Sequence, residues 1–434
     1  MNKCSVVAFL TITMFLTGMA DAENWPSWRG PTQNGLAAAM GNPPLTWSET
    51  ENIRWKVAIP GEGNSTPVVW GDKIFVTTAV RIGEALEKPR GRRPRGEPAP
   101  KPTNAYKFNL MCLDRNTGEI LWERTAAEAV PHEGHHVSST YSPQSAMTDG
   151  EFVWISFGSQ GIHCYDMDGN SQWDKPTMPL TISNEFGEGA SAVLAGDAIV
   201  VTLDHEGESK IVAYNKADGS ILWEKARDEE STWATPLVEE IDGTLQVITA
   251  GQLGIRGYNA KNGELLWEMS GLLDSAIPMP VVGHGNVYLS AGYQRPQLKA
   301  VKLGVTGEIT DESVVWQVNK NTPYVSSPLL WGDRIYVTRG LSGSLSSFNA
   351  LTGEAIYERG KLEGIRQVYA SPVGVANRIY IPGRKGLTIV VKHSDTFEIL
   401  ASNQLDDGLD GSPVVIGDVL YLRGAKNLYC IAEK

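Results

Sequence analysis

The chain contains 434 residues, of which 41% are hydrophobic, and it includes 45 glycines and 24 prolines. This composition can supply a large core, and the many turn-forming residues favour an all-β protein. The net charge of −12 argues against nucleic acid as the main partner, because phosphate binding requires a basic surface.

The first 22 residues have the pattern of a secretory signal peptide. Lys3 precedes an apolar run from Val6 to Leu16, and Ala20-Asp21-Ala22 fits the small-x-small cleavage site. The apolar run is too short to span a bilayer stably. We expect a mature chain that begins at Glu23, is periplasmic or secreted, and has no transmembrane span.

Residues 23–46 are predicted to form an N-terminal extension rather than a strand. Its segment Trp25-Pro26-Ser27-Trp28-Arg29-Gly30-Pro31 has proline near both ends and glycine within it. We expect this segment to lie across the folded body with its tryptophans in grooves. The segment from Asn52 to Ala58 then alternates polar and apolar residues, as a half-buried strand does.

Residues 81–105 form a basic, proline-rich insertion with too few apolar residues to fold by itself. Its candidate contact residues are Arg90, Arg92, Arg93 and Arg95. Two interpretations remain open. The insertion is either a solvated loop, tolerated because extra loop length costs little, or an electrostatic docking arm for an acidic partner or anionic surface.

The best-formed motif of the chain runs from Leu113 to Trp122, with Asp114 and Gly118 between two apolar runs. Related copies occur at residues 165–173, 214–223, 258–267 and 348–357. Each copy predicts a hairpin, in which Asp or Asn bonds its own backbone and Gly adopts a positive φ. The interval of about 45 to 50 residues is the period of propeller blades.

A second repeated feature is a short strand opening that often contains Ser-Pro or Thr-Pro. Eight openings occur, at Ser65-Thr66-Pro67, Ser142-Pro143, Ala192-Val193, Thr235-Pro236, Met279-Pro280, Ser327-Pro328, Ser371-Pro372 and Ser412-Pro413. They predict one domain, residues 47–434, folded as an eight-bladed β-propeller with about four strands in each blade. The last unit supplies three strands, so we expect the strand around Trp55 to complete it and close the ring.

Propeller topology separates two faces of the ring. Hairpins between the first and second and between the third and fourth strands of each blade share one face. Loops between the second and third strands, and the crossings between blades, share the other. The irregular segments fall mostly on this crossing-loop face. The candidate binding residues there are His136, Asn184, Glu185, Trp233, Arg366, Tyr369, Asp407 and Asp410, either as a ring at the channel mouth or as ordinary loop side chains.

The segment from Pro131 to His136 contains three histidines and Glu133, which is a possible ligand set for Zn²⁺ or Cu²⁺. Adjacent histidines point apart in extended backbone, so no metal site is predicted, and His132 and His135 are weak candidates only. Cys112, Cys164 and Cys430 precede a turn or the chain end in similar contexts. We expect these three to be buried structural thiols.

The repeated Asp-x-x-Thr-Gly-x-x-x-Trp pattern resembles the tryptophan-docking repeat of pyrroloquinoline-quinone (PQQ) type propellers. The Trp-x-x-Trp-Arg-Gly-Pro opening and the Leu-Tyr-Cys-Ile ending resemble secreted bacterial PQQ-like repeat proteins. The resemblance implies that tryptophans pin neighbouring blades together; these are Trp55, Trp122, Trp173, Trp223, Trp267 and Trp316.

That fold is shared by quinoprotein dehydrogenases and by the propeller subunit of the outer-membrane barrel-assembly machinery. The dehydrogenases hold PQQ and Ca²⁺, use an Asp base and often contain a disulfide of adjacent cysteines. This chain has no Cys-Cys pair and no loop rich enough in oxygen ligands for a Ca²⁺ cage. We therefore predict no cofactor.

The leading hypothesis is a non-enzymatic binding or scaffold module for a protein or cell-envelope partner. The first alternative is a PQQ- or metal-dependent oxidoreductase with its site at the channel mouth. The second is a carbohydrate-binding propeller that uses Trp233 and Tyr369. The sequence leaves the oligomeric state open.

Overall fold

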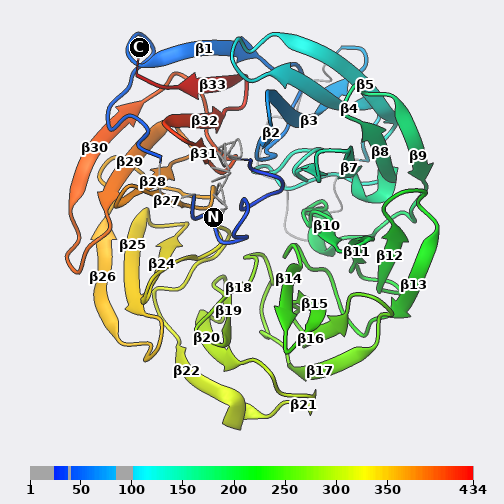
Figure 1. Ribbon diagram of the computed structural model, residues 1–434, viewed down its shortest axis with the longest axis vertical. Helices are drawn as coiled ribbons and strands as arrows, with labels where there is room; N and C mark the ends of the chain where they lie inside the picture. The colour runs from blue at the N-terminus through cyan, green and yellow to red at the C-terminus, as the bar shows by residue number, and fades with distance from the viewer. Residues whose placement is uncertain (1–23, 38–40, 85–100, 434) are drawn as a thin grey trace, which may run out of the picture.

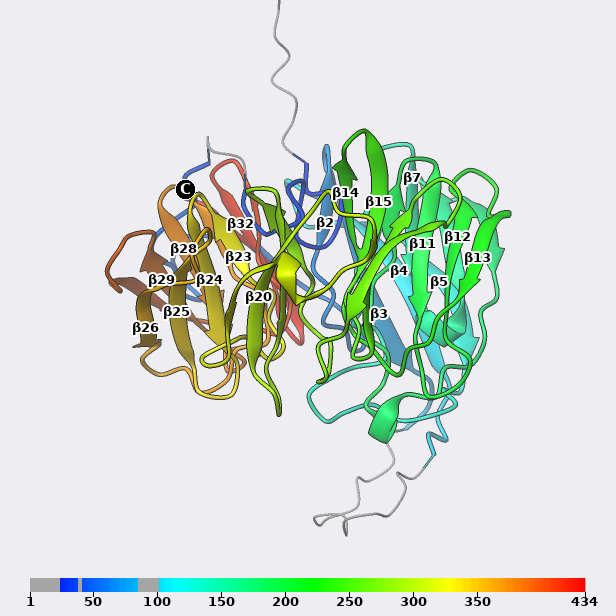
Figure 2. The same cartoon turned by 90° about the horizontal axis from the view of Figure 1, so that it is seen from below.

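The computed structural model describes residues 24–37, 41–84 and 101–433 and contains eight small sheets arranged as a ring around a central channel (Figure 1). Viewed from the side, the strands run between the two faces of the ring (Figure 2). The predicted all-β, eight-bladed propeller is therefore confirmed. The predicted signal peptide lies outside the described residues, as do Arg90, Arg92, Arg93 and Arg95.

Each blade is an antiparallel sheet with its first strand beside the channel. Blades 1 and 2 contain β2 (Val68–Trp70), β3 (Lys73–Arg81), β4 (Tyr106–Asp114), β5 (Ile120–Ala129), β6 (Met147–Thr148), β7 (Phe152–Ser156), β8 (Ile162–Asp166) and β9 (Ser171–Lys175). Blades 3 and 4 contain β10 (Val193–Ala195), β11 (Ala198–Leu203), β12 (Lys210–Asn215), β13 (Ile221–Ala226), β14 (Leu237–Ile241), β15 (Thr244–Thr249), β16 (Gly254–Asn259) and β17 (Leu265–Ser270).

The second half of the ring repeats this arrangement. Blades 5 and 6 contain β18 (Val281–Gly283), β19 (Asn286–Ala291), β20 (Gln297–Lys302), β22 (Val314–Val318), β23 (Leu329–Trp331), β24 (Arg334–Arg339), β25 (Ser344–Asn349) and β26 (Ala355–Lys361). Blades 7 and 8 contain β27 (Val373–Val375), β28 (Arg378–Pro382), β29 (Leu387–Lys392), β30 (Ile399–Gln404), β31 (Val414–Ile416), β32 (Val419–Arg423), β33 (Asn427–Ile431) and β1 (Ile53–Ala58). Three short 3₁₀ turns are η1 (Gly158–Gln160), η2 (Ser183–Glu185) and η3 (Asp311–Ser313).

The ring closes through the N-terminal strand, as predicted. β1 pairs antiparallel with β33, and Trp55 lies opposite Cys430. The last blade is thus built from both ends of the chain, which removes two exposed sheet edges. Cys112 and Cys164 face Trp122 and Trp173 in the same way.

Cys112, Cys164 and Cys430 are free and buried, which confirms the expected structural thiols. Burial raises the pKa of Cys112, Cys164 and Cys430 to about 12.

The hairpin motif forms for the reason its sequence suggests. The Asp114 carboxylate accepts hydrogen bonds from the backbone N–H groups of Asn116 and Thr117, at 2.9 and 2.8 Å. Gly118 then adopts φ +75, and a Cβ there would lie 2.7 Å from the ring of Trp55. Because only glycine fits both requirements, the turn can receive the tryptophan of the preceding blade.

Five of the six docking tryptophans make one type of contact with the next blade. Each indole Nε1 donates to a backbone carbonyl in or beside that blade's hairpin turn, at 2.8 to 3.2 Å. The pairs are Trp55 with Arg115, Trp122 with Met167, Trp173 with Lys216, Trp223 with Ala260 and Trp316 with Ala350.

Trp267 differs from the expected docking geometry. Its Nε1 donates to Oε1 of Gln246 in its own blade, at 2.9 Å. The fifth blade has a longer turn between its last two strands, and β21 (Gly307–Glu308) of that turn pairs parallel with β17. The longer turn therefore adds a fifth strand to blade 4 in place of the usual tryptophan-to-carbonyl contact.

The N-terminal extension crosses the central channel and contacts six blades. Its backbone pairs with Val69 of blade 1 and Gly374 of blade 7. Other hydrogen bonds reach blades 2, 4, 6 and 8, through Thr148, Val238, Leu330 and Ser412. The first described residues accordingly lie at the centre of the ring in Figure 1.

A belt of hydroxyl groups links the blades around the channel. In six of the eight blades, the residue two positions before the first strand accepts, through its hydroxyl, an N–H hydrogen bond from the equivalent residue of the preceding blade. The hydroxyls of Ser145, Ser191, Thr235, Ser327, Ser371 and Ser412 accept these bonds at 2.8 to 3.0 Å. Met279 holds this position in blade 5 and has no hydroxyl.

The belt corrects one sequence assignment. Ser142-Pro143 was expected to open blade 2, but Ser145 occupies the equivalent belt position and β6 starts at Met147. The Ser-Pro dipeptide is not a reliable marker of the first strand, because the residue after the belt position need not be proline. Ala146 and Ala192 occupy this position in blades 2 and 3.

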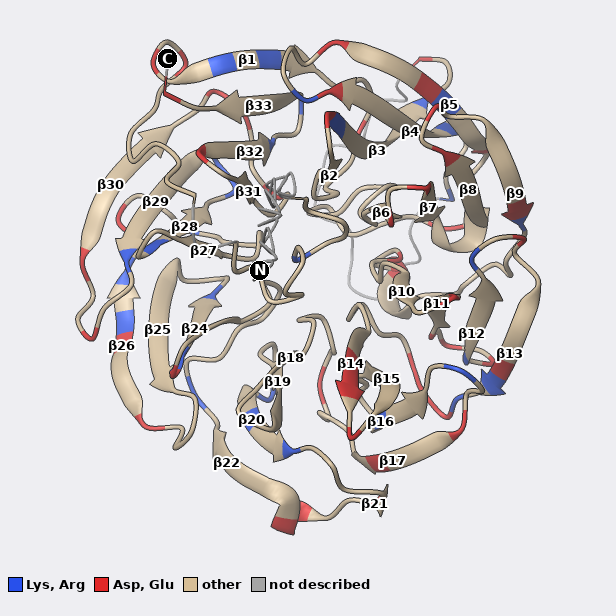
Figure 3. Cartoon of the chain, in the orientation of Figure 1, with Lys and Arg blue, Asp and Glu red and all other residues tan. Residues whose placement is uncertain are grey.

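The outer strands carry acidic and basic residues interspersed (Figure 3). Within the described part of the chain, no helix is long and apolar enough to cross a membrane.

Candidate functional site

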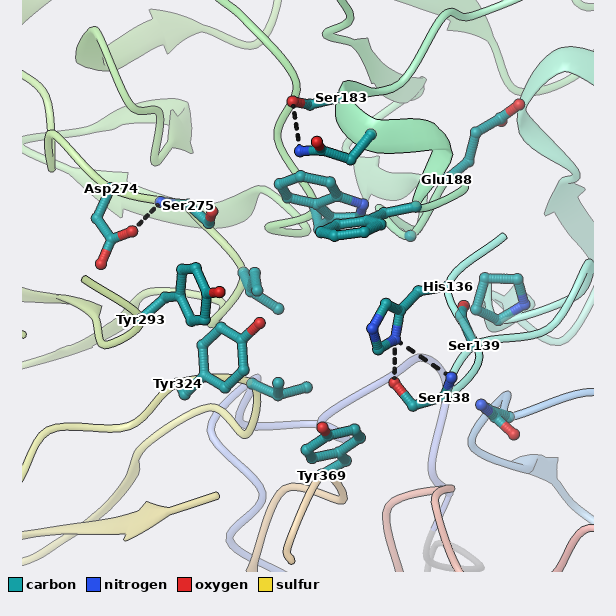
Figure 4. A pocket seen from close by; sticks show the side chains of 18 of the residues that line it. His136, Ser138, Ser139, Ser183, Glu188, Asp274, Ser275, Tyr293, Tyr324 and Tyr369 are labelled. Carbon is teal, nitrogen blue, oxygen red and sulfur yellow. Dashed lines mark hydrogen bonds between the residues drawn. The ribbon is translucent and has the colours of Figure 1, made fainter. Parts of the chain in front are cut away.

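A pocket of about 660 Å³ opens at the channel mouth on the crossing-loop face (Figure 4). Its size falls in the range of ligand-binding pockets. One residue from every blade contributes, always the residue two positions before the hydroxyl belt. This inner ring consists of Asn64, Pro143, Gly189, Trp233, Ile277, Val325, Tyr369 and Asp410. The propeller framework thus fixes eight positions around the mouth and leaves their side chains free to vary.

Trp28 of the N-terminal extension forms the inner end of the pocket. Its Nε1 donates to the Ser412 hydroxyl at 3.3 Å. A smaller cavity of about 180 Å³ borders Trp28 from the side of Pro26, Gly30 and Met147. Trp28 therefore lies between the two cavities, at the inner end of the mouth pocket.

Three tyrosines form one wall of the pocket. The rings of Tyr293 and Tyr324 stack with centroids 5.2 Å apart. Figure 4 shows their hydroxyls turned toward the open centre, with Tyr369 beside them and His136 opposite. Trp233 donates its Nε1 to the Gly187 carbonyl at 2.7 Å, so the protein already satisfies its polar atom.

His136 lies on the opposite side of the pocket and is held from three directions. Its backbone N–H donates to the Phe186 carbonyl, and its ring meets the Phe186 ring edge-on at 4.9 Å. Its Nδ1 lies 2.6 Å from the Ser138 hydroxyl. Burial, with the nearby Arg384 and His135, lowers the pKa of His136, which favours the neutral imidazole.

The carboxylates of the pocket are engaged with protein groups. Asp274 accepts backbone N–H bonds from Ser275, Gln294 and Arg295, at 2.7 to 2.9 Å. Asp410 pairs with both Nε and Nη2 of Arg384, at 2.8 and 2.9 Å. Burial raises the pKa of Asp410, while Arg384 opposes that rise.

Glu188 directs its carboxylate away from the three tyrosines, toward η1 (Figure 4). It accepts hydrogen bonds from the backbone N–H and the hydroxyl of Ser159. Burial raises the pKa of Glu188 to about 7 despite these bonds.

Six exposed apolar side chains lie on the crossing-loop face, and four of them, Phe186, Leu253, Leu273 and Tyr293, line the pocket. All six are located in crossings or in loops between second and third strands. They are Val137, Phe186, Leu253, Leu273, Tyr293 and Leu341, with exposures from 38% to 86%. Leu273 also has φ +54, a strained conformation for leucine. We call this set the apolar rim.

The sequence-predicted binding residues divide into two groups. His136, Asn184, Trp233, Tyr369 and Asp410 line the pocket together. The structure does not bring Glu185, Arg366 and Asp407 to the lining. Arg366 is an exposed residue of the crossing into blade 7. The Asp407 carboxylate accepts backbone N–H bonds from Gly408, Lys426 and Asn427 and so fastens two loops together.

The histidine segment makes structural contacts. His132 Nε2 lies 2.7 Å from the Leu180 carbonyl, and His135 Nδ1 lies 2.9 Å from the His136 carbonyl. Among residues 24–37, 41–84 and 101–433, no group of three or more His, Cys, Asp or Glu is placed to hold a metal ion. Ca²⁺ requires six or more oxygens, and the pocket carboxylates already have protein partners. The described residues therefore do not fit a PQQ–Ca²⁺ centre.

Sequence reasoning missed Tyr293, Tyr324, Asp274 and the role of Trp28. The inner-ring spacing was a usable signal, because each ring residue precedes a belt residue by two positions. Tyr293 lies in a short loop between the second and third strands of blade 5, which carries no repeat signal. Trp28 reaches the pocket through a long-range path that no local pattern predicts.

Comparisons with known proteins agree with the geometry of the ring. A family model described as "Outer membrane protein assembly factor BamB" matches residues 158–354. No curated protein sequence matches the chain. These findings and the fold confirm the predicted PQQ-like propeller.

Among solved structures, BamB from Moraxella catarrhalis is similar, with a TM-score of 0.57 and 16% identity over 87% of this chain and 98% of that one. The computationally designed protein Ika8 is similar with a TM-score of 0.55 and 11% identity, over 89% of this chain and 99% of that one. A europium-containing methanol dehydrogenase has a TM-score of 0.49 and 11% identity, over 95% of this chain and 98% of that one.

Proposed function

We propose that the protein is a non-enzymatic binding module of the cell envelope, which captures an envelope partner through its crossing-loop face. The observation that carries this proposal is that four exposed apolar side chains of the rim line a single pocket. Large exposed apolar areas with polar surroundings are typical of interaction sites. The matched family model, described as an assembly factor, supports a binding role and an envelope location.

The chemistry of the pocket favours binding over catalysis. A general acid or base needs a titrating group within hydrogen-bond reach of the substrate. Asp274 and Asp410 are occupied by protein donors, and Glu188 points away from the tyrosine wall. The group best placed to face a ligand is the neutral His136, which has no carboxylate partner in the described structure to orient it as a base.

Substitution of the rim tests the proposal directly. In Leu273→Glu, a charge replaces an apolar side chain at the pocket mouth, so recovery of envelope partners in a pull-down should fall at least about tenfold, or about 1.4 kcal/mol. The matched control is Ile221→Glu on β13, because both side chains are 57% exposed. Equal recovery by the two variants would contradict the proposal.

A further inference from the structure

The interior of the pocket differs in chemistry from its rim. Aromatic faces are offered by Trp28, Trp233 and the tyrosine wall, and hydroxyls and amides stand between them. Neutral polar lining groups include Ser138, Ser139, Asn184, Gln252, Ser275 and Gln294. A surface that alternates π-faces and neutral hydrogen-bonding groups restricts the class of ligand.

Charged ligands are disfavoured in this interior. An anion held inside the pocket needs a cation there. Arg384 is bonded to both oxygens of Asp410 and stacks over Tyr369 at 4.5 Å, and Arg295, the one guanidinium among the lining residues, is exposed on the loop after Tyr293. A buried cation needs carboxylate oxygens that face it, whereas Asp274 already uses three of its about four acceptor positions on backbone N–H groups. Desolvation of an unpaired charge would cost several kcal/mol.

A purely apolar ligand is also disfavoured. The hydroxyls of Tyr293 and Tyr324 face the open centre of the pocket (Figure 4). An apolar group that displaced water from them would leave each without a partner, at a cost of about 1–3 kcal/mol per group. The ligand must therefore supply hydrogen bonds along its edge and C–H groups on its faces. Sugar rings have this division, because their hydroxyls project outward and their C–H bonds meet the negative face of an aromatic ring.

We propose that the mouth pocket binds one end of a neutral carbohydrate chain. This inference rests on the proposed function and names the chemistry of the captured partner. Trp28 lies between the mouth pocket and the smaller cavity, so the chain enters end-on and its first sugar stops at Trp28. The terminal sugar stacks against the tyrosine wall, and Trp233 provides a further apolar face.

Calorimetric titration of the full chain with maltotriose, cellotriose and chitotriose tests the inference. Trigalacturonate is the anionic counterpart, and N-acetyltryptophanamide is a peptide-like aromatic probe. At least one neutral trisaccharide should bind and the other two probes should not. Tyr293→Ala should weaken that binding at least tenfold, because Tyr293 is 54% exposed and its loss leaves the core intact. Leu351→Ala, at a 46% exposed position beyond the pocket, should bind like the original chain.

The outcomes separate this inference from the function it rests on. If N-acetyltryptophanamide binds and no neutral trisaccharide does, the carbohydrate proposal is wrong and a peptide-like partner remains. If no probe binds but partner recovery still falls in Leu273→Glu, the carbohydrate proposal is also wrong. The proposed partner-binding role of the crossing-loop face then remains. Recovery that is insensitive to Leu273→Glu contradicts the docking face itself.

Discussion

Glu188 combines an enclosed carboxyl group with a place at the pocket edge. Burial raises its pKa to about 7, so the folded chain favours the protonated form more than the unfolded chain does. The resulting stability is complete below the ordinary Glu pKa, near 4.5, and is lost as the pH rises through about 7.

Glu188→Gln should remove this pH dependence, because an amide does not titrate. Between pH 4.5 and 7.5, the free energy of unfolding of the original chain should fall relative to that of the variant by up to about 3 kcal/mol. Urea denaturation of both proteins across this range measures the difference. Parallel curves would show that the site does not titrate in this window.

Single residues also show how far the site could be predicted from sequence. Trp233, Tyr369 and Asp410 were placed correctly because each precedes a belt residue by two positions. Arg366 and Asp407 precede their belt residues by five positions, so they lie elsewhere along the crossing. The two-residue spacing identifies the inner ring, whereas His136 and Asn184 reach the pocket from nine and seven positions before their belt residues.

At the scale of elements, contacts between blades depend on glycines that accept a tryptophan ring. Gly118 has φ +75 and faces Trp55, whereas Gly285 has φ +71 and no atom within 4 Å of the position that a Cβ would occupy. Gly285→Ala should therefore cost only the left-handed strain, about 1–2 kcal/mol. Gly118→Ala should cost about 1–3 kcal/mol more, because Trp55 must shift. Chemical denaturation compares the two, and equal losses would remove ring contact as a source of stability.

The insertion between β3 and β4 supports a prediction about function rather than folding. The backbone N–H of Ile82 donates to the Ala105 carbonyl at 2.7 Å and closes its base. Deletion of residues 84–101 should change the free energy of unfolding by no more than about 0.5 kcal/mol, since loop length costs little. Partner recovery should fall if the insertion is a docking arm; unchanged recovery would identify it as a solvated loop.

At the scale of the whole molecule, the hydroxyl belt makes neighbouring blades depend on one another. Ser371→Ala removes the acceptor of the buried Ser327 N–H, a bond of 2.8 Å. Loss of that acceptor should cost about 1–3 kcal/mol. The control Ser402→Ala, at an exposed position of β30, should be nearly neutral. Thermal or urea unfolding of both variants decides whether the belt contributes to stability.

The architecture was predictable because turn chemistry repeats locally. Asp114 and Gly118 define a hairpin without reference to the rest of the chain, and the unpaired strand around Trp55 implies ring closure. The replacement of the tryptophan-to-carbonyl contact at Trp267 by strand pairing was not predictable. It depends on where the longer turn of the fifth blade packs. Local rules gave the number of blades, and long-range packing decided their exceptions.

The extension's path through the channel has a consequence for the timing of folding. Trp28 and Arg29 are made early, yet their partners Pro328, Pro372 and Ser412 belong to the last three blades. Until those blades have been synthesised, the pocket is incomplete and β1 lacks β33, the strand with which it pairs. Contacts between distant parts of a chain form slowly. A chain that stops before β33 would therefore lack both ring closure and a complete binding pocket, so the pocket is finished only when the whole chain has folded.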